Sequence, residues 1–470
     1  MTMFIKGGTV ISATGADKAD VLVDGEKIIA VMFPGSDPAL SAESGAERVI
    51  DATDKYVIPG GIDAHTHMEL PFGGTAASDT FETGTRAAAW GGTTTIIDFP
   101  VQSFGMAVRD GLDTWKAKAE GNCAIDYAFH MIIGDVNDAS LKEMDKLVDE
   151  GITSFKLFMA YPGVFLSDDA QILRAMQQAA GNGSMIMMHA ENGIAIDLLA
   201  QQAVDRGETD PYYHGVVRRE EFESEATHRA IKLAKVGAAP LYIVHLSASE
   251  ALEEVTRARD KGANVFAETC PQYLYLSLED HLGRPGFEGA GFVCSTPLRS
   301  KHEHHSRDLW KGLRTNDLSV VSTDHCPFCM KDQKELGVGD FRAIPNGIGG
   351  VEHRMDLIYQ GVVMGELTLP RWVELCSTTP ARMFGLYPQK GSIQPGADAD
   401  IVLYDPNASW TISVDNHHMN MDYSAYEGHE IQGKVDTVIS RGRVVIENNS
   451  YHGKKGDGKF LPRGLSQYLI

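Results

Sequence analysis

Eight short apolar runs in the middle of the chain constrain its fold more than any other feature of the sequence. These runs are rich in β-branched residues and occupy residues 56–62, 93–99, 127–133, 154–159, 184–188, 241–244, 264–267 and 318–322. Helix-like segments lie between them, at 81–90, 141–150, 169–180, 220–236 and 249–261. Buried strands that alternate with helices are typical of a parallel sheet covered on its faces, and eight such units favour a closed (β/α)8 barrel. We therefore predict an α/β fold with this TIM-like barrel over residues 56–390.

The two ends of the chain carry β-rich runs that no helical pattern follows. They lie at residues 3–11, 20–23, 27–31 and 48–50, and again at 401–404, 411–414, 435–439 and 443–447. The first set is typical of a small antiparallel layer, and the second set has the same character. We predict that residues 1–55 and 391–450 combine in one β-sandwich beside the barrel. We expect the tail, residues 451–470, to reach a neighbouring subunit.

Composition and charge argue against several classes of partner. The formal net charge of −22 argues against binding to nucleic acid or to an anionic membrane surface. We find no long apolar run and no N-terminal signal pattern, so we expect no membrane contact. Six cysteines in a chain of 470 residues do not make a disulfide framework, which favours the cytoplasm. Cys326 and Cys329 form a Cys-x-x-Cys pair, but no second pair completes a zinc site.

Metal-binding residue types collect where the predicted barrel strands end. Barrel enzymes hold their reactive groups at the C-terminal ends of the strands. The first strand ends in His65 and His67, which in an extended chain point to the same side and suit zinc or a similar divalent ion. The fifth strand ends in His189, the sixth in His245 and the eighth in Asp324. One such histidine alone is typical of a packed residue, but four histidines and an aspartate at one mouth predict a metal site.

Lys156 lies within the fourth predicted strand, where a buried ammonium is costly unless it is paired or neutral. Burial lowers the pKa of a lysine and makes the free amine available as a nucleophile. An amine held between two cations can capture carbon dioxide and become a carbamate that bridges both metals. A Schiff base and a salt bridge to Asp324 are the alternatives, and spacing alone does not choose among the three.

Seven motifs accompany these residues along the chain. They read PGGIDAHTH at 59–67, FKLFMAY at 155–161, HAEN at 189–192, VHLS at 244–247, ETCPQYL at 268–274, TDHCPF at 323–328 and IPNG at 344–347. Together they resemble the motifs of the cyclic amidohydrolases, and within them the dihydropyrimidinase and D-hydantoinase group. The resemblance covers essentially the whole chain, and it implies a small cyclic amide as substrate and a homotetramer or homodimer as the assembly.

The resemblance also implies a binuclear zinc centre with two Zn²⁺ ions per subunit. The ligands would be His65, His67 and Asp324 for the more buried ion, His189 and His245 for the other, and carbamylated Lys156 as the bridge. Tyr161 corresponds to a tyrosine that relatives use in the reaction. Backbone groups at Ser295 and Asn346 would hold the amide groups of the substrate.

The function that this centre implies is hydrolytic ring opening. Two metals lower the pKa of a bridging water, so that hydroxide is available near neutral pH to attack the ring carbonyl. Tyr161 would stabilise the oxyanion, and Asp324 would carry the proton from the water to the leaving nitrogen. A 5,6-dihydropyrimidine such as dihydrouracil or dihydrothymine would give an N-carbamoyl-β-amino acid. A 5-substituted hydantoin would give an N-carbamoyl-α-amino acid.

Two other functions stay open at this point. An amidohydrolase that opens allantoin would share the metal ligands. Non-catalytic assembly proteins of this fold have lost those ligands, whereas this chain keeps all six candidate positions. A dihydroorotase is disfavoured, because relatives of that type carry an arginine just after the paired histidines, where this chain has Met68 and Glu69.

Apolar residues near the paired histidines and Tyr161 are candidates for a lid over the exocyclic substituent of the substrate, with ordinary packing as the alternative. These residues are Met68, Leu70, Phe72 and Phe158. We predict no metal binding by the other histidines that lie in groups or within a strand. We expect a solvated position for His302, His304, His305, His417 and His418, and core packing for His130.

Overall fold

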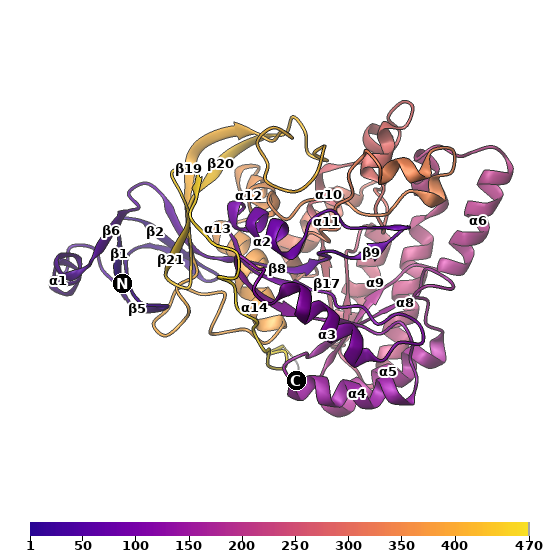
Figure 1. The fold of residues 1–470 in the computed structure, drawn as a ribbon, viewed down its shortest axis with the longest axis horizontal. Helices are drawn as coiled ribbons and strands as arrows, with labels where there is room; N and C mark the ends of the chain where they lie inside the picture. The colour runs from indigo at the N-terminus through magenta and orange to yellow at the C-terminus, as the bar shows by residue number, and fades with distance from the viewer. Residues whose placement is uncertain (469–470) are drawn as a thin grey trace.

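A closed ring of parallel strands forms the centre of the larger domain in the computed structural model, which describes residues 1–468 (Figure 1). The strands are β8 (Gly61–Thr66), β11 (Thr93–Asp98), β12 (Asp126–Phe129), β13 (Met131–Ile132), β14 (Ser154–Phe158), β15 (Met185–His189), β16 (Leu241–Ile243), β17 (Val265–Thr269) and β18 (Val320–Val321). They pair in the orders β12-β11-β8 and β13-β14-β15-β16-β17-β18. Parallel bridges between Thr66 and His325 and between Val101 and Ile132 join these two arcs. β12 and β13 are two halves of one strand that is interrupted at His130, so the two arcs together contain eight strands. The predicted (β/α)8 barrel is therefore confirmed.

Helices surround this ring on the outside (Figure 1). They are α2 (Phe81–Trp90), α3 (Val108–Ala119), α4 (Asp138–Asp149), α5 (Asp169–Asn182), α6 (Gly193–Asp205), α7 (Tyr212–Val217), α8 (Glu220–Gly237), α9 (Ser249–Asp260), α10 (Pro271–Tyr275), α11 (His305–Thr315), α12 (Arg354–Val363), α13 (Leu369–Val373) and α14 (Thr379–Met383). Shorter helical turns are η1 (Leu278–Leu282), η2 (Glu288–Phe292), η3 (Lys334–Gly337), η4 (Phe341–Ala343) and η5 (Glu374–Thr378). Capping boxes at Thr80, Asn137 and Asp168 set where α2, α4 and α5 begin. Among residues 1–468, no helix has both the length and the apolar character that a bilayer crossing requires.

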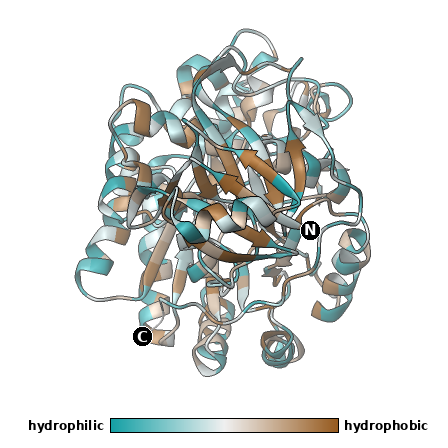
Figure 2. Ribbon diagram, turned by 90° about the vertical axis from the view of Figure 1, so that its left-hand side faces the viewer, coloured by the Kyte–Doolittle hydropathy of each residue, from teal (hydrophilic) through white to brown (hydrophobic). Residues whose placement is uncertain are grey.

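The two ends of the chain meet in a β-sandwich beside the barrel, as predicted (Figure 1). Its first sheet has the order β5-β4-β1-β6, with β1 (Thr2–Lys6), β4 (Asp20–Asp24), β5 (Lys27–Met32) and β6 (Arg48–Asp51). Its second sheet has the order β22-β21-β20-β19-β7-β2-β3, with β2 (Thr9–Ser12), β3 (Gly15–Lys18), β7 (Tyr56–Pro59), β19 (Ile401–Thr411), β20 (Glu430–Ser440), β21 (Arg443–Glu447) and β22 (Ser450–Tyr451). Seen from the sandwich end, hydrophobic residues follow the central strands and hydrophilic residues dominate the surrounding loops (Figure 2). One apolar core joins the sheets, with Met3 and Val21 from the first and Val57 and Leu403 from the second.

The prediction of a purely antiparallel N-terminal layer is wrong in one respect. Strand β1 pairs with β6 in parallel, and β2 pairs with β7 in parallel. Parallel neighbours need a crossover connection, and α1 (Asp37–Gly45), which lies between β5 and β6, supplies one for the first pair. The predicted runs 401–404 and 411–414 also differ from the structure, because the single long strand β19 includes the whole of the first run but only Thr411 of the second.

A buried network of ion pairs joins the sandwich to the barrel. Lys390, which is 2% exposed, lies 2.6 Å from carboxylate oxygens of Asp126 and Asp400 and 3.0 Å from one of Asp398. Arg441, at the end of β20, donates to Asp126 at 2.9 Å. Burial opposes the positive charge, but the three carboxylates hold the pKa of Lys390 above its usual value. The network therefore fixes the start of β12 to the strands of the sandwich.

We expect Lys390→Met to lower the free energy of unfolding by about 3–5 kcal/mol, because it leaves three buried carboxylates without their shared cation. Denaturant unfolding followed by fluorescence measures the change. Lys459→Met is the matched control, since Lys459 is 58% exposed where it pairs with Glu26 and such a pair contributes about 0–1 kcal/mol. Equal unfolding midpoints for the two variants would contradict a stabilising role of the network.

The C-terminal tail lies across the N-terminal end of its own barrel. The amide of Leu461 donates to Tyr127 O at 2.8 Å, and Lys459 O accepts from the amide of Tyr127 at 3.0 Å. The side chain of Arg463, which is 3% exposed, donates to Phe129 O at 2.6 Å and to Ser154 Oγ at 2.8 Å. The tail as far as Tyr468 thus covers the face opposite the strand ends that carry the histidines. Its predicted contact with a neighbouring subunit stays a prediction.

Candidate metal centre and active site

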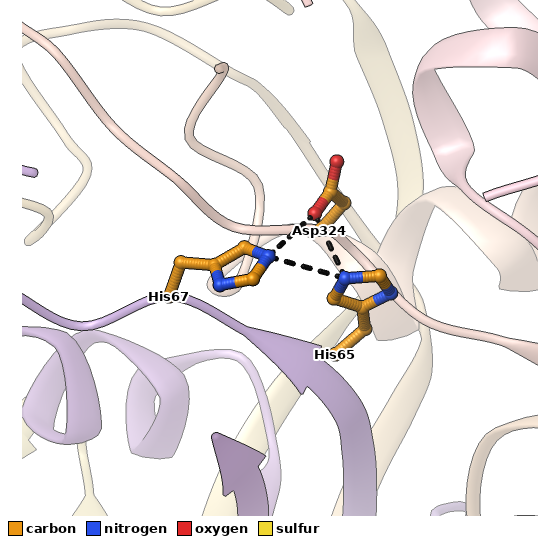
Figure 3. A group of neighbouring side chains, drawn as sticks. All are labelled: His65, His67 and Asp324. Atoms are coloured by element: carbon orange, nitrogen blue, oxygen red, sulfur yellow. Dashed lines mark hydrogen bonds and ion pairs between the residues drawn. The ribbon is translucent and has the colours of Figure 1, made fainter. Parts of the chain in front are cut away.

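His65, His67 and Asp324 converge at the C-terminal end of the barrel (Figure 3). Strand β8 brings in the two histidines, and Asp324 lies three residues after β18. The two Nε2 atoms are 3.2 Å apart, and Asp324 Oδ1 lies 3.1 Å from that of His65 and 3.2 Å from that of His67. Both rings point at the same carboxylate oxygen, while the second oxygen of Asp324 points away from them (Figure 3). The structure therefore brings together three residues from opposite ends of the barrel sequence.

The donor atoms of this group fit a divalent metal ion. Nδ1 of His65 lies 2.5 Å from Glu268 Oε1, so this nitrogen carries the ring proton and Nε2 presents a lone pair. Burial lowers the pKa of His67 to about 3, which keeps this imidazole neutral. Three acceptor atoms that converge in a buried space repel one another unless a cation lies among them. Two imidazole nitrogens and one carboxylate oxygen are a typical ligand set for zinc.

His189 and His245 form a second group of the same kind. Nδ1 of His189 lies 3.0 Å from Nε2 of His245, and Nε2 of His189 lies 2.6 Å from Glu191 Oε2. Arg218 donates to the same oxygen of Glu191 at 3.0 Å. Each histidine group is thus oriented by one buried carboxylate, as is usual for imidazoles that bind metal. The two groups are adjacent, because the rings of His65 and His245 have centroids 5.5 Å apart.

Lys156 reaches into this space from β14, where its side chain is 1% exposed. Its Nζ lies 2.9 Å from Nε2 of His65 and 4.5 Å from the centre of the Phe99 ring. Burial lowers the pKa of Lys156 to about 8, so a useful fraction of the amine is neutral near pH 7. Within the described residues, the ion pairs of Asp324 are with His65 and His67, and not with Lys156. The geometry therefore argues against the salt-bridge alternative for this lysine.

The predicted substrate residues lie together on one wall of the same pocket. Asn346 Nδ2 donates to Ser295 Oγ at 3.0 Å and to Tyr161 Oη at 3.5 Å. Burial raises the pKa of Tyr161 to about 12, so its hydroxyl keeps its proton and can donate a hydrogen bond at neutral pH. Tyr161, His245 and Asp324 have φ of 61°, 39° and 52°, a region that non-glycine residues rarely adopt. Three residues of the candidate site thus have strained backbones, which is common at functional sites.

Three of the four lid candidates line this pocket, and one does not. Leu70, Phe72 and Phe158 contribute to the wall that faces the candidate ligands. Phe72 lies in the hairpin of β9 (Pro71–Phe72) and β10 (Thr75–Ala76), 5.4 Å from the ring of Tyr161. Met68 is fully buried and packs against Gly84 of α2, where a Cβ would lie only 2.3 Å from its sulfur. The lid prediction is therefore wrong for Met68, whose role is packing.

A wider cavity of about 840 Å³ opens beyond the inner pocket. The two share Phe72, Tyr161, Phe165 and Asn346 in their linings. The outer cavity is lined mainly by apolar residues, and Asp197, Arg218 and Arg342 contribute charged groups. Ligand pockets of about 300–1,000 Å³ hold drug-sized molecules, so a substituent larger than a methyl group has room here.

The other histidines and the cysteines lie outside the candidate metal centre. His130 packs in the core as predicted, with Nε2 3.0 Å from Ala64 O. His305 is 5% exposed and its Nδ1 accepts from Ser249 N, so the prediction of a solvated position is wrong for it, because α11 packs its first turn against α9. His418 is partly covered as well, since it stacks on Trp90 with ring centroids 3.9 Å apart. All six cysteines lie in the described part of the chain and are free thiols.

Glu268 is a functional residue that the sequence reasoning missed. It lies in β17 and is fully buried. Besides its contact with His65, its Oε1 accepts from the backbone amide of His245 at 3.2 Å and its Oε2 accepts from Tyr242 Oη at 2.9 Å. One carboxylate thus fixes a residue of each histidine group. The available signal was an acidic residue directly after the seventh predicted strand.

We expect Glu268→Gln to weaken metal binding by about 10–100-fold, because an amide cannot hold the ring proton of His65 as a carboxylate does. Titration of the metal-free protein with zinc against a competing chelator measures this affinity. Glu254→Gln is the matched control, because Glu254 lies on α9, outside the candidate metal centre, and pairs with the exposed side chain of His228 on α8. Unchanged zinc affinity in a folded Glu268→Gln variant would contradict the assigned orienting role.

Comparisons with known proteins agree with this geometry. The model of the Amidohydrolase family matches residues 56–445. The D-hydantoinase of Streptomyces coelicolor is 65% identical to the chain over 465 residues, covering 99% of this chain and 98% of that protein. The D-hydantoinase of Geobacillus stearothermophilus is 46% identical, covering 98% and 97%. The crystal structure of dihydropyrimidinase from Brevibacillus agri superposes with a TM-score of 0.95 at 46% identity, covering 99% of both chains.

A further solved structure widens the comparison. The L-hydantoinase (dihydropyrimidinase) of Arthrobacter aurescens has a TM-score of 0.88 at 30% identity, covering 98% of this chain and 99% of that one. The similarity thus extends over the sandwich as well as the barrel. From its barrel, its histidine groups and these full-length relatives, the chain belongs to the amidohydrolase family, in the group of the D-hydantoinases and dihydropyrimidinases.

Proposed function

We propose that the protein opens the ring of cyclic amides by hydrolysis, with 5-substituted hydantoins and 5,6-dihydropyrimidines as the substrate classes. The observation that carries this proposal is the convergence of two histidine groups, Lys156, Tyr161 and Asn346 on one pocket at the barrel mouth. The D-hydantoinase and dihydropyrimidinase relatives support the choice of reaction. The products would be N-carbamoyl-α-amino acids and N-carbamoyl-β-amino acids, respectively.

The chain offers ligands for two zinc ions. His65, His67 and Asp324 would hold one ion, His189 and His245 the other, and Lys156 as a carbamate would bridge them. The neutral amine of Lys156 would add to carbon dioxide and release one proton, which gives a carboxylate at the position of Nζ. When bound, the two ions would polarise the ring carbonyl and make a water acidic enough to attack near neutral pH.

The side chains around the ions would orient the substrate and move the proton. Ser295 and Asn346 would hold the ring amide, and the Tyr161 hydroxyl would donate to the oxyanion as the carbonyl carbon becomes tetrahedral. An aspartate carboxylate is ionised at neutral pH, and an ion held by His65, His67 and Asp324 would keep Asp324 in that form. Its oxygen that points away from the two rings would take the proton of the attacking water and pass it to the leaving nitrogen.

The zinc identity, the carbamate and the homotetramer or homodimer belong to the same proposal and come from the family resemblance. The cytoplasmic location is proposed from the cysteine content. The hypothesis of a non-catalytic assembly protein is disfavoured, because every candidate ligand position is present and the full-length relatives are hydantoinases.

Side-by-side assays of dihydrouracil and a bulky 5-substituted hydantoin test this function. We expect both rings to open with zinc-loaded protein and neither with chelated protein. Because the outer cavity adjoins the pocket, we expect the bulky hydantoin to be the faster substrate. Turnover of neither ring by protein with bound zinc would contradict the proposal, and allantoin would then be the next substrate to assay.

A further inference from the structure

Lys334 is a fully buried lysine that lies outside the candidate metal centre. It begins η3, in the long segment that follows β18, and its exposed fraction is 0%. Its Nζ donates to three backbone carbonyl oxygens, at 3.0 Å to Val293, 2.7 Å to Pro345 and 2.8 Å to Gly347. An ammonium has three N–H donors, so all of them are used.

The groups around this ammonium are neutral. The thiols of Cys294 and Cys326 and the imidazole of His214 lie near it, and the ring centre of Phe328 lies 5.7 Å away. Burial lowers the pKa of Lys334 to about 7, while donation to carbonyl oxygens favours the protonated form. A buried cation without a carboxylate partner is costly, which argues that the three carbonyl contacts serve a purpose beyond packing.

The three carbonyls belong to the two loops that carry the predicted substrate contacts. Val293 lies two residues before Ser295, and Pro345 and Gly347 flank Asn346. The loops also contact each other directly, because the amide of Gly347 donates to Val293 O at 2.9 Å. The loop that contains Asn346 also packs tightly against Cys326, because a Cβ at Gly347 would lie 2.1 Å from Cys326 O. The second loop is therefore held between Lys334 and the segment that follows Asp324.

We propose that Lys334 is a positioning residue for substrate binding, which gathers the carbonyls of both loops so that Ser295 and Asn346 face the ring amide together. The inference rests on the proposed function, because that function assigns the amide contacts. Lys334 touches neither the substrate nor a candidate metal ligand. Its loss is therefore expected to act on substrate affinity more than on the chemical step or on metal content.

Lys334→Met tests this role, because methionine is similar in length and donates no hydrogen bond. We expect KM for a 5-substituted hydantoin to rise by about tenfold or more, as when one or two substrate hydrogen bonds are misaligned. We expect a smaller change in kcat and an unchanged zinc content. Lys334→Gln keeps two N–H donors, so its KM should lie between those of the wild type and of Lys334→Met. It replaces the methionine variant in this test if that variant does not fold. Lys331→Met, an exposed lysine in the same segment, is the matched control.

Hydrogen–deuterium exchange reads the loop contact without any substrate. We expect the Gly347 amide to lose protection in both Lys334 variants, while amides of β14 and β15 keep theirs. Wild-type KM and an equally protected Gly347 amide in the folded variants would overturn the proposal, and so would a loss of zinc that parallels the loss of activity. If wild-type protein opened no cyclic amide, the proposed function would fail, whereas the exchange data would still decide whether Lys334 holds the loops.

Discussion

Replacement of Asp324 by alanine is expected to lower kcat for ring opening by about 10³–10⁴-fold. General acid–base groups contribute about 10²–10⁴-fold, and we propose that Asp324 is also a metal ligand, because its Oδ1 lies within 3.2 Å of both His65 and His67. Asp324 has φ of 52°, which asparagine adopts more readily than alanine. We therefore expect Asp324→Asn to fold at least as well as the alanine variant and to lose similar activity. Steady-state kinetics with zinc added and circular dichroism measure both quantities.

Asp356→Asn is the matched control for this experiment. Asp356 is another buried carboxyl, on α12, and burial raises its pKa to about 7, so that the amide replaces a group that is about half protonated at pH 7 and lies outside the candidate metal centre. We expect this variant to keep most of the wild-type kcat. Full activity of a folded Asp324→Ala protein would remove Asp324 from the proposed proton pathway.

Lys156→Ala is expected to lower turnover by at least about 10³-fold and to lower the bound zinc, because the proposed bridging carbamate cannot form without the lysine amine. A short carboxylic acid such as acetate or propionate fits the space that the side chain leaves and supplies the same functional group. We therefore expect added carboxylate to restore part of both zinc binding and turnover. Zinc content by atomic absorption and turnover as a function of carboxylate concentration are the measurements.

The same experiment distinguishes the alternatives for this lysine. Restoration by a primary amine instead of a carboxylate, or a covalent adduct trapped by borohydride with wild-type protein, would support a Schiff base and exclude the carbamate. Wild-type protein with the same carboxylates is the control, and its activity should not increase. Undiminished zinc content and turnover in Lys156→Ala would contradict any bridging role.

Much of the fold was predictable because its signal is local. Each barrel strand is buried on both faces, so it appears in the sequence as a continuous apolar run. The parallel pairing of β1 with β6 was not predictable in this way, because it joins residues more than 40 positions apart in the chain. The interruption at His130 was hidden for a similar reason, since its partners Ser154 and Ala64 come from other strands.

Some residues of the candidate site were likewise predictable from the sequence, and others were not. His65, His67 and Asp324 were predictable, because strand ends in a barrel point to one mouth and these residue types bind metal. Glu268 left a weaker signal, since one acidic residue after a strand also fits a solvated turn. Lys334 left none, because its partners are backbone carbonyls and every residue has one. The amino-acid sequence therefore does not show which backbone carbonyls a side chain will contact.

The ion pairs between barrel and sandwich have a consequence for synthesis on the ribosome. Asp126 and Arg441 are 315 residues apart in the chain. At about 5–20 residues per second, roughly 15–60 s pass between translation of the first and of the second. Asp126 lacks Arg441 throughout that interval, and it lacks Lys390 as well until residue 390 has been made. The sandwich strands and the tail that follow residue 390 therefore complete the N-terminal end of the barrel last, and a chain that stops before residue 390 has neither cation beside Asp126.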